Sequence, residues 1–274
     1  MGINIHYIHK KNLIHPSQED LRVIKKREKA FLVPENISPS RSIKFAKKPW
    51  GYEYLCFKNR HLDIWEMRLY PNHCTSFHCH PKKDVLKIIL EGKIKLETFR
   101  KSEILGAGKF KLIKGNTAHR TKNIGRATAK ILEIESPPDK KKLIRINDRY
   151  GRQDTPYIAS AFPSKLKLAF PLKDPFRKEK SIKCRNFHLF RLPSGRKTKL
   201  LGIRMASLKS VRINDDPKFE KIIEKRKLLL VLDGSMAISM KNKREIFLPG
   251  DGFFLKTNNR GNIIPRNGCL LLLI

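Results

Sequence analysis

The chain has 274 residues, with 60 Lys+Arg against 25 Asp+Glu and a formal net charge of +35. This length allows one large domain or two smaller ones, each with its own core. No stretch of 18 consecutive apolar residues is present, which excludes a membrane-spanning helix. The charge favours anionic partners, but the basic residues are spread along the whole chain, which disfavours nucleic acid as the partner.

The five cysteines form no CxxC pair and leave one without a partner, which indicates a reducing compartment. The first residues, MGINIHYIHKKNLIH, lack the unbroken apolar segment of a signal peptide. We therefore expect a cytoplasmic protein with no membrane partner.

Residues 1–42 are predicted to form an N-terminal extension. Ser17 is a typical N-cap residue, and it opens the segment SQEDLRVIKKREKAF, where a short helix is predicted. The following VPENISPSRS has the composition of a loop. The function is not expected to lie in this extension.

Residues 43–152 contain short apolar or alternating runs separated by Gly, Pro and Asn. The runs are YEYLCF, LDIWEMRLY, VLKIILEG, KIKLETF, KFKLI and AKILEIE. Regular short strands with turn residues between them are typical of an antiparallel sandwich or barrel. The sequence therefore predicts an all-β domain here.

Residues 186–274 contain a second series of this kind: FHLFRL, TKLLGIRMASL, KLLLVLDG, SMAISM, REIFLPGDGFFLK and GCLLLLI. The phrases IILEGKIKLE and LVLDGSMAIS place Gly92 and Gly234 after an acidic residue, which predicts a tight hairpin at each glycine. We assign residues 153–185 to a linker between two antiparallel β-barrels.

The segment TSFHCHPKKDVLKIILEG places His78 and His80 one residue apart at the start of an apolar strand. Positions i and i+2 of a strand share a face, so both imidazoles are expected to point at one spot, with Cys79 facing the other way and packing. Two donors rarely hold a divalent ion alone, so a third is expected from another strand. The candidate is His119, in GKFKLIKGNTAHRTKN. Each histidine alone is more often a core or surface residue, but the three together predict a metal centre.

These residues resemble the two sequence motifs of the cupin family. The first, G-x5-H-x-H-x3/4-E-x6-G, is matched by Asn72 in the first Gly place, His78, His80 and Gly92. The second, G-x5-P-x-G-x2-H-x3-N, is matched by Gly108, Lys114 in the Pro place, Asn116 in the second Gly place, His119 and Asn123. Asn tolerates the left-handed conformation that a turn Gly provides. The resemblance implies a cupin-type jelly-roll, or double-stranded β-helix, for residues 43–152.

The chain departs from this pattern at the acidic metal ligand. Val85 stands in the place counted back from Gly92, and Asp84 lies one residue earlier. Adjacent strand residues face opposite sides, so Asp84 ligates only if a bulge or loop turns it inward. Otherwise the site consists of three histidines and water, which is the alternative we favour. Neutral imidazoles suit Zn, Fe, Mn, Ni or Co, and open positions are left for water or substrate.

The second half does not match the motifs. Glu220, Ile222 and Lys227 occupy the ligand places of the first motif, and Gly261 occupies the histidine place of the second. The resemblance therefore implies a bicupin with a degenerate second barrel over residues 186–274. Because cupins often pair through their sheets, we also expect a homodimer.

Residues 46–152 also resemble the cupin domain of type II mannose-6-phosphate isomerases. KPWGY matches the opening Pro-Trp-Gly phrase of that domain, and LIRINDRYGR matches its closing phrase. This resemblance implies a sugar-phosphate or nucleotide-sugar substrate and a role in surface polysaccharide synthesis.

Sugar isomerisation needs a base and a group that holds the phosphate. The expected base is Glu133 or Glu135, and the expected phosphate ligands are Arg145, Arg152 or Lys82, because guanidinium forks suit phosphate oxygens. The alternative for the two glutamates is simple pairing with neighbouring lysines.

Two other functions stay open, because the HxH pair replaces the Gln-x-His of that subgroup and its Glu ligand is missing. The first is a three-histidine iron dioxygenase. The second is a non-catalytic, sugar-binding cupin.

Overall fold

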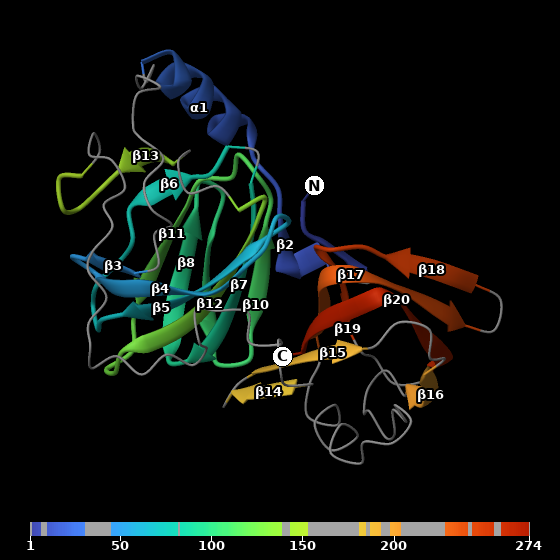
Figure 1. The fold of residues 1–274 in the computed structure, drawn as a ribbon. Helices are drawn as coiled ribbons and strands as arrows, with labels where there is room; N and C mark the ends of the chain where they lie inside the picture. Colours follow the sequence, from blue (N-terminus) through green and yellow to red (C-terminus); the bar gives the residue numbers. More distant parts are fainter. Residues whose placement is uncertain are drawn as a thin grey trace. The chain divides into compact units, whose positions relative to one another are not determined.

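The computed structural model describes residues 2–6, 10–30, 45–81, 83–138, 143–152, 181–184, 187–192, 198–203, 228–240, 243–254 and 259–273. The chain divides into two compact units, with Met1–His9 and Lys173–Ile274 in unit 1 and Lys10–Leu172 in unit 2 (Figure 1). Within the described ranges there are twenty strands in three sheets and one α-helix, so the predicted all-β fold class is confirmed.

Unit 2 contains a seven-stranded sheet, whose strands run antiparallel except for the parallel pair β2 and β10. Its order is β2 (Leu13–Ile14), β10 (Phe110–Ile113), β7 (Asp84–Glu91), β12 (Ala129–Ser136), β5 (Asp63–Leu69), β4 (Gly51–Lys58) and β3 (Phe45–Lys48). All six runs predicted in residues 43–152 coincide with strands of unit 2, whereas β2, with two residues, and β3, with four, are too short to give a recognisable pattern.

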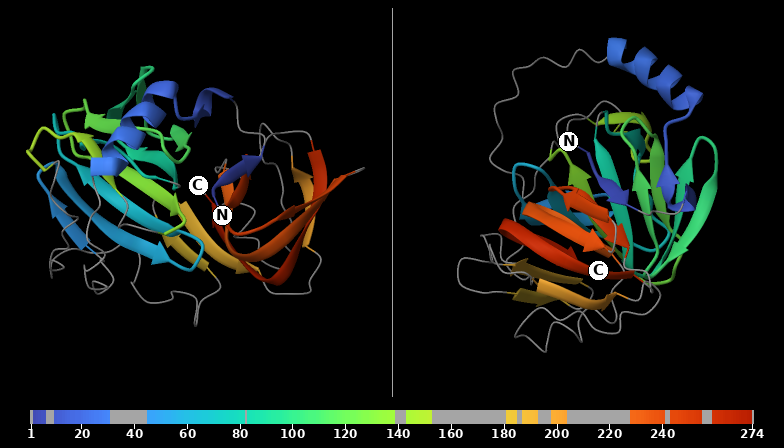
Figure 2. Two further views of the ribbon diagram at one scale, coloured as in Figure 1. Left: turned by 90° about the horizontal axis from the view of Figure 1, so that it is seen from above. Right: turned by 90° about the vertical axis from the view of Figure 1, so that its right-hand side faces the viewer.

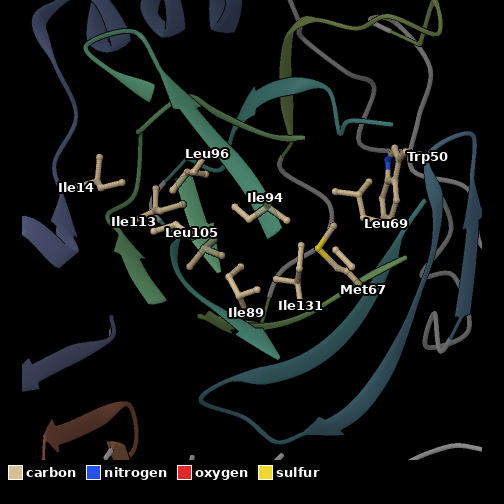
Figure 3. Packing of buried hydrophobic residues seen from close by; sticks show 12 residues of the cluster. Ile14, Trp50, Met67, Leu69, Ile89, Ile94, Leu96, Leu105, Ile113 and Ile131 are labelled. Carbon is tan, nitrogen blue, oxygen red and sulfur yellow. The ribbon is translucent and has the colours of Figure 1, made fainter. Parts of the chain in front are cut away.

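A second, five-stranded antiparallel sheet completes unit 2. Its order is β13 (Ile144–Asn147), β6 (Phe77–Cys79), β11 (His119–Asn123), β8 (Lys93–Thr98) and β9 (Ser102–Gly106). The core lies between the two sheets, because its buried side chains come from strands of both (Figure 3). They include Met67, Val85, Ile89, Ile94, Leu96, Leu105, Ile113 and Ile131.

The predicted hairpin at Gly92 is wrong. β7 and β8, which flank this glycine, belong to different sheets and do not pair. Gly92 has a φ of 88°, and a Cβ at this position would lie 3.1 Å from the Cα of Ala129. The glycine therefore makes a corner at which the chain crosses from one sheet to the other.

The described strands of unit 1 form one eight-stranded sheet. Its main path is β1 (Asn4–His6), β19 (Asp251–Phe254), β17 (Leu228–Met240), β20 (Asn259–Leu273), β15 (Phe187–Leu192) and β14 (Ser181–Cys184), with β18 (Lys243–Phe247) paired to β17 and β16 (Thr198–Ile203) to β20. The predicted hairpin at Gly234 is also wrong, because β17 continues through it with register shifts against β20 at Val231/Asp233 and Asp233/Ser235. A second barrel over residues 186–274 stays a prediction.

The predicted helix of the N-terminal extension is confirmed as α1 (Gln18–Ala30), which follows the short 3-10 helix η1 (Lys10–Asn12). The Ser17 hydroxyl accepts a hydrogen bond from the Asp20 amide at 3.1 Å, as the predicted N-cap requires. The right-hand view of Figure 2 shows α1 outside the sheets, at one end of the strands of unit 2.

Residues 1–42 do not form one separate segment, since Asn4–His6 pair with β19 of unit 1 and Leu13–Ile14 pair with β10 of unit 2. Most of the predicted linker, residues 153–180, lies outside the described residues. In the described part of the chain, no helix has the length and apolar character needed to cross a membrane.

The substitution Gly51→Ala tests the close contact between β4 and β5. Gly51 has a φ of 143°, and a Cβ here would lie 1.9 Å from the carbonyl oxygen of Arg68. We expect a loss of about 2–3 kcal/mol in the free energy of unfolding, measured by urea denaturation. Gly106→Ala is the control, because a Cβ there meets nothing within 4 Å; equal losses in both variants would contradict the prediction.

Candidate metal centre

The pairing of β6 with β11 brings the three predicted histidines together. His78 lies in β6, His80 directly follows it, and His119 is the first residue of β11, directly opposite His78 in the register. One nitrogen of each ring can be chosen so that all three lie within 4.8 Å of one another. A single ion can therefore reach all three rings.

Two of the rings are held by backbone carbonyls that face their Nδ1 atoms. The His78 Nδ1 lies 2.8 Å from the Ser76 carbonyl oxygen, and the His119 Nδ1 lies 3.0 Å from the Thr117 carbonyl oxygen. A carbonyl oxygen only accepts, so Nδ1–H donates in each case and the lone pair of the neutral ring is on Nε2. This is the usual way in which a protein orients a histidine for a metal.

The residues present fit a metal ion. The Nε2 atom of His119 is buried and has no hydrogen-bond partner among the described residues, although an unpaired buried polar atom costs about 1–3 kcal/mol. A metal ion would complete the coordination of this atom.

The surroundings of His78 and His119 keep these two rings neutral, which is the form that binds metal. Burial, followed by the charge of Lys87, lowers the pKa of His78 from 6.5 to about 3. Burial, followed by the charges of His78 and Lys87, lowers the pKa of His119 well below its ordinary value.

The turns that precede the ligands contain the asparagines predicted to replace glycine. Asn72 has a φ of 61° and Asn116 a φ of 66°, so both adopt the expected left-handed conformation. The Asn116 amide also donates to the carbonyl oxygen of His80 at 3.1 Å. This turn therefore connects the segment before His119 to the second histidine.

Asn123, the last residue of the second motif, has a structural role. Its side-chain amide donates to the carbonyl oxygens of Leu69 and Ala127 at 2.8 and 2.9 Å, and its side-chain oxygen accepts from the Gly125 amide at 2.8 Å. These bonds fix the end of β11, the strand that begins with His119.

Asp84 is not in the group of clustered side chains. Its carboxylate pairs with the Lys114 ammonium at 2.5 Å and accepts a hydrogen bond from the Gly115 amide at 2.9 Å. The register of β7 on β12 is regular at Asp84, so no bulge turns this side chain inward. Val85 instead faces the apolar core, and the geometry favours the alternative with three histidines.

A pocket next to the histidines is lined by Glu133 and Glu135 of β12. Glu133 pairs with Lys87, its register partner on β7, and Glu135 pairs with Lys83 at 2.9 Å. All four side chains are buried. Both glutamates therefore pair with lysines, which is the alternative role considered for them, and both also line the pocket.

The two lysines were missed by reasoning from the sequence, although a signal was present. In VLKIILE, Lys87 is in phase with Val85 and Ile89, which both face the core. A lysine in phase with core residues on a strand is expected to point inward and to need a buried partner.

Arg145 and Arg152 both line the same pocket, together with Lys48, which reasoning from the sequence had also missed. Arg145 lies in β13 opposite His78, is buried, and donates to the Arg152 carbonyl oxygen at 3.1 Å. The guanidinium of Arg152 makes a two-pronged contact with Asp148, at 2.7 and 2.8 Å. Lys82 lies outside the described residues.

The sequence matches none of the known protein families and none of the curated proteins with which it was compared. Similar solved structures include cupin-superfamily proteins. KdgF from Halomonas sp. is 14% identical, with 34% of this chain and 84% of that chain covered and a TM-score of 0.33.

Two further structures are similar to a comparable extent. A cupin-superfamily sugar phosphate isomerase from Silicibacter pomeroyi is 17% identical, with 31% of this chain and 56% of that chain covered and a TM-score of 0.29. An RmlC-like cupin from Shewanella frigidimarina is 12% identical, with 39% and 94% covered and a TM-score of 0.32. No conclusion about activity follows from similarities of this extent.

The lowered histidine pKa values predict an acid-sensitive fold for the metal-free protein. Below pH 6.5 the unfolded chain binds a proton at His78, whereas the folded protein does so only near pH 3. Stability therefore falls as the pH decreases through this window, by about 1.4 kcal/mol per pH unit for each such histidine. Urea denaturation between pH 7 and pH 4, in the presence of a chelator, measures the slope. His78→Gln should reduce it, and an unchanged slope would show that His78 is not the cause.

Proposed function

We propose that unit 2 is a metal-dependent cupin barrel that isomerises a phosphorylated or nucleotide-linked sugar, in the manner of the mannose-6-phosphate isomerases. One observation carries the proposal: three buried histidines converge beside a pocket that is also lined by two glutamates and two arginines. The histidines supply metal ligands, one of the glutamates supplies a base, and Arg145 supplies a phosphate ligand.

The His78, His80 and His119 rings hold a divalent ion, which is Zn, Fe, Mn, Ni or Co by the chemistry of an all-imidazole site. When bound, such an ion polarises the sugar carbonyl and stabilises the negative charge that develops on its oxygen. Because the ligand set contains no carboxylate, the ion keeps its full double charge, which favours an anionic substrate.

The proton transfer is assigned to Glu133, with Glu135 as the alternative base. The carboxylate takes the proton from C2 of the aldose, and the electrons of the C–H bond form the double bond of an enediol. The same proton is then returned to C1, while a hydroxyl proton moves from O2 to O1, which gives the ketose. The ion pair with Lys87 holds the Glu133 carboxylate at the wall of the pocket.

Arg145 is the preferred phosphate ligand. It is buried at the pocket wall on the strand next to β6, within the same sheet as the histidines. The Arg152 guanidinium donates two hydrogen bonds to the Asp148 carboxylate, so we assign Arg152 to stabilising the turn between these two residues. A homodimer and a role in surface polysaccharide synthesis remain predictions.

Metal content tests the site itself. Elemental analysis of protein purified without added metal is expected to find about one divalent ion per chain. His119→Ala is expected to weaken metal binding by more than about 100-fold, because it removes a ligand rather than an outer partner. His15→Ala, at an exposed position outside the cluster, serves as the control. Full metal content in the His119 variant would contradict the site.

Turnover of mannose 6-phosphate, followed as fructose 6-phosphate formed in the presence of each metal, tests the reaction. Glu133→Gln should lower kcat by about 100-fold or more, as expected for loss of a base, whereas Arg145→Ala should mainly raise KM. Lys109→Ala, at an exposed position, is the control.

The two alternative functions give different results in the same assays. Iron in the protein together with oxygen consumption would favour the dioxygenase. Saccharide binding without turnover and without metal would favour the non-catalytic protein. Either outcome would overturn the proposed isomerase.

A further inference from the structure

The helix α1 packs on β6, β13 and the residue before β11, against side chains that alternate with those of the histidine site. Its Ile24 packs against Cys79 and Ala118, and all three side chains are buried. Cys79 stands between His78 and His80 in the sequence and, as predicted, packs away from them. The helix therefore contacts the residues adjacent to the proposed ligands, on the opposite face of the same strands (Figure 1).

Asp20 connects this helix directly to the segment that carries His119. Its carboxylate is buried, with a side chain 2% exposed. One oxygen, Oδ1, accepts a hydrogen bond from the Ala118 amide at 2.7 Å, and the other, Oδ2, accepts from the Ser17 amide at 2.6 Å and from the Ser17 hydroxyl at 2.5 Å. A helix cap requires only the bonds to Ser17, so the bond to Ala118 needs a separate explanation.

A second connection joins α1 to the strand on the other side of β6. The Arg27 guanidinium donates to the carbonyl oxygen of Ile146 in β13 at 3.3 Å. The sheet order is β13, β6, β11, so the helix is tied to both neighbours of the strand that carries His78. Ile144 and Ile146, on either side of Arg145, also pack against the cluster formed by Ile24.

We propose that α1 is the positioning element of the metal centre, and that Asp20 is its principal positioning residue. The inference rests on the proposed metal site and assigns a role to the N-terminal extension, in which no function had been expected. The Asp20 carboxylate accepts one charge-assisted bond from the Ala118 amide and two from Ser17, and so holds the Ala118 amide against the helix end. These bonds fix the backbone from which the His119 ring projects, and small displacements of a ligand weaken a metal site.

The test compares four variants of the full chain. Asp20→Ala removes the bonds to Ala118 and to Ser17, and Asp20→Asn keeps one oxygen that can accept from Ala118. Ser17→Ala removes only the capping hydroxyl. Glu19→Ala is the matched control, because this neighbouring carboxylate makes an exposed ion pair with Arg22. Two quantities are measured at a temperature where all variants are folded: the Co²⁺ dissociation constant, by visible absorption, and hydrogen exchange of the Ala118 and His119 amides.

Asp20→Ala is expected to raise the Co²⁺ dissociation constant about 10-fold and to accelerate exchange at both amides. Asp20→Asn should restore affinity to within about threefold of the wild type, whereas Ser17→Ala should lower the unfolding temperature and leave affinity within about twofold. Equal weakening of Co²⁺ binding by Asp20→Ala and Ser17→Ala would overturn the inference, because the effect would then be one of helix stability.

The exchange measurement separates this inference from the proposed function. If the wild type does not bind Co²⁺, the proposed metal centre fails. In that case, faster exchange confined to the residues around Ala118 and His119 in Asp20→Ala would still show that Asp20 fixes the backbone of this segment. Unchanged exchange there would overturn the inference.

Discussion

The pairing of β6 with β11 is the contact on which the proposed site depends. It places His78 opposite His119 in the register, and the chain direction after β6 brings His80 to the same side. Carbonyl oxygens of Ser76 and Thr117 then hold two of the rings with Nε2 available. A shift of one residue in this pairing would turn one histidine to the opposite face and remove the site.

The wall of the pocket is unusual because buried charges lie next to apolar core. Lys87 of β7 and Lys83, which directly precedes that strand, are buried and pair with Glu133 and Glu135 on the adjacent β12. Buried charges are tolerated only when they are paired. The antiparallel register places Glu133 opposite Lys87, and the Lys83 ammonium reaches Glu135 at 2.9 Å from just outside the strand. Burial is the larger cause of the lowered His78 pKa, and the charge of Lys87, which also pairs with a glutamate of the pocket wall, adds to it.

Gly92 and Gly234 show where local patterns were insufficient. A Gly after an acidic residue between two strand-like runs has the sequence pattern of a tight hairpin, and hairpins were predicted at Gly92 and Gly234. Gly92 instead lies where the chain changes sheets, and Gly234 lies within one long strand that has register shifts. A glycine with positive φ fits a hairpin, a change of sheet and a register shift within a strand equally well. Only the pairing partners of the flanking strands distinguish these three structures.

The sequence by itself determined the all-β class, the capped helix, the left-handed asparagines and the three candidate ligands. Each follows from a local property: strand alternation, capping chemistry, backbone sterics or motif spacing. Only the tertiary structure decided that Asp84 pairs with Lys114, that the glutamates pair with lysines, and that α1 packs against residues next to the histidines. These contacts join residues far apart in the chain, and which side chains meet there depends on sheet order and register, which local patterns do not encode.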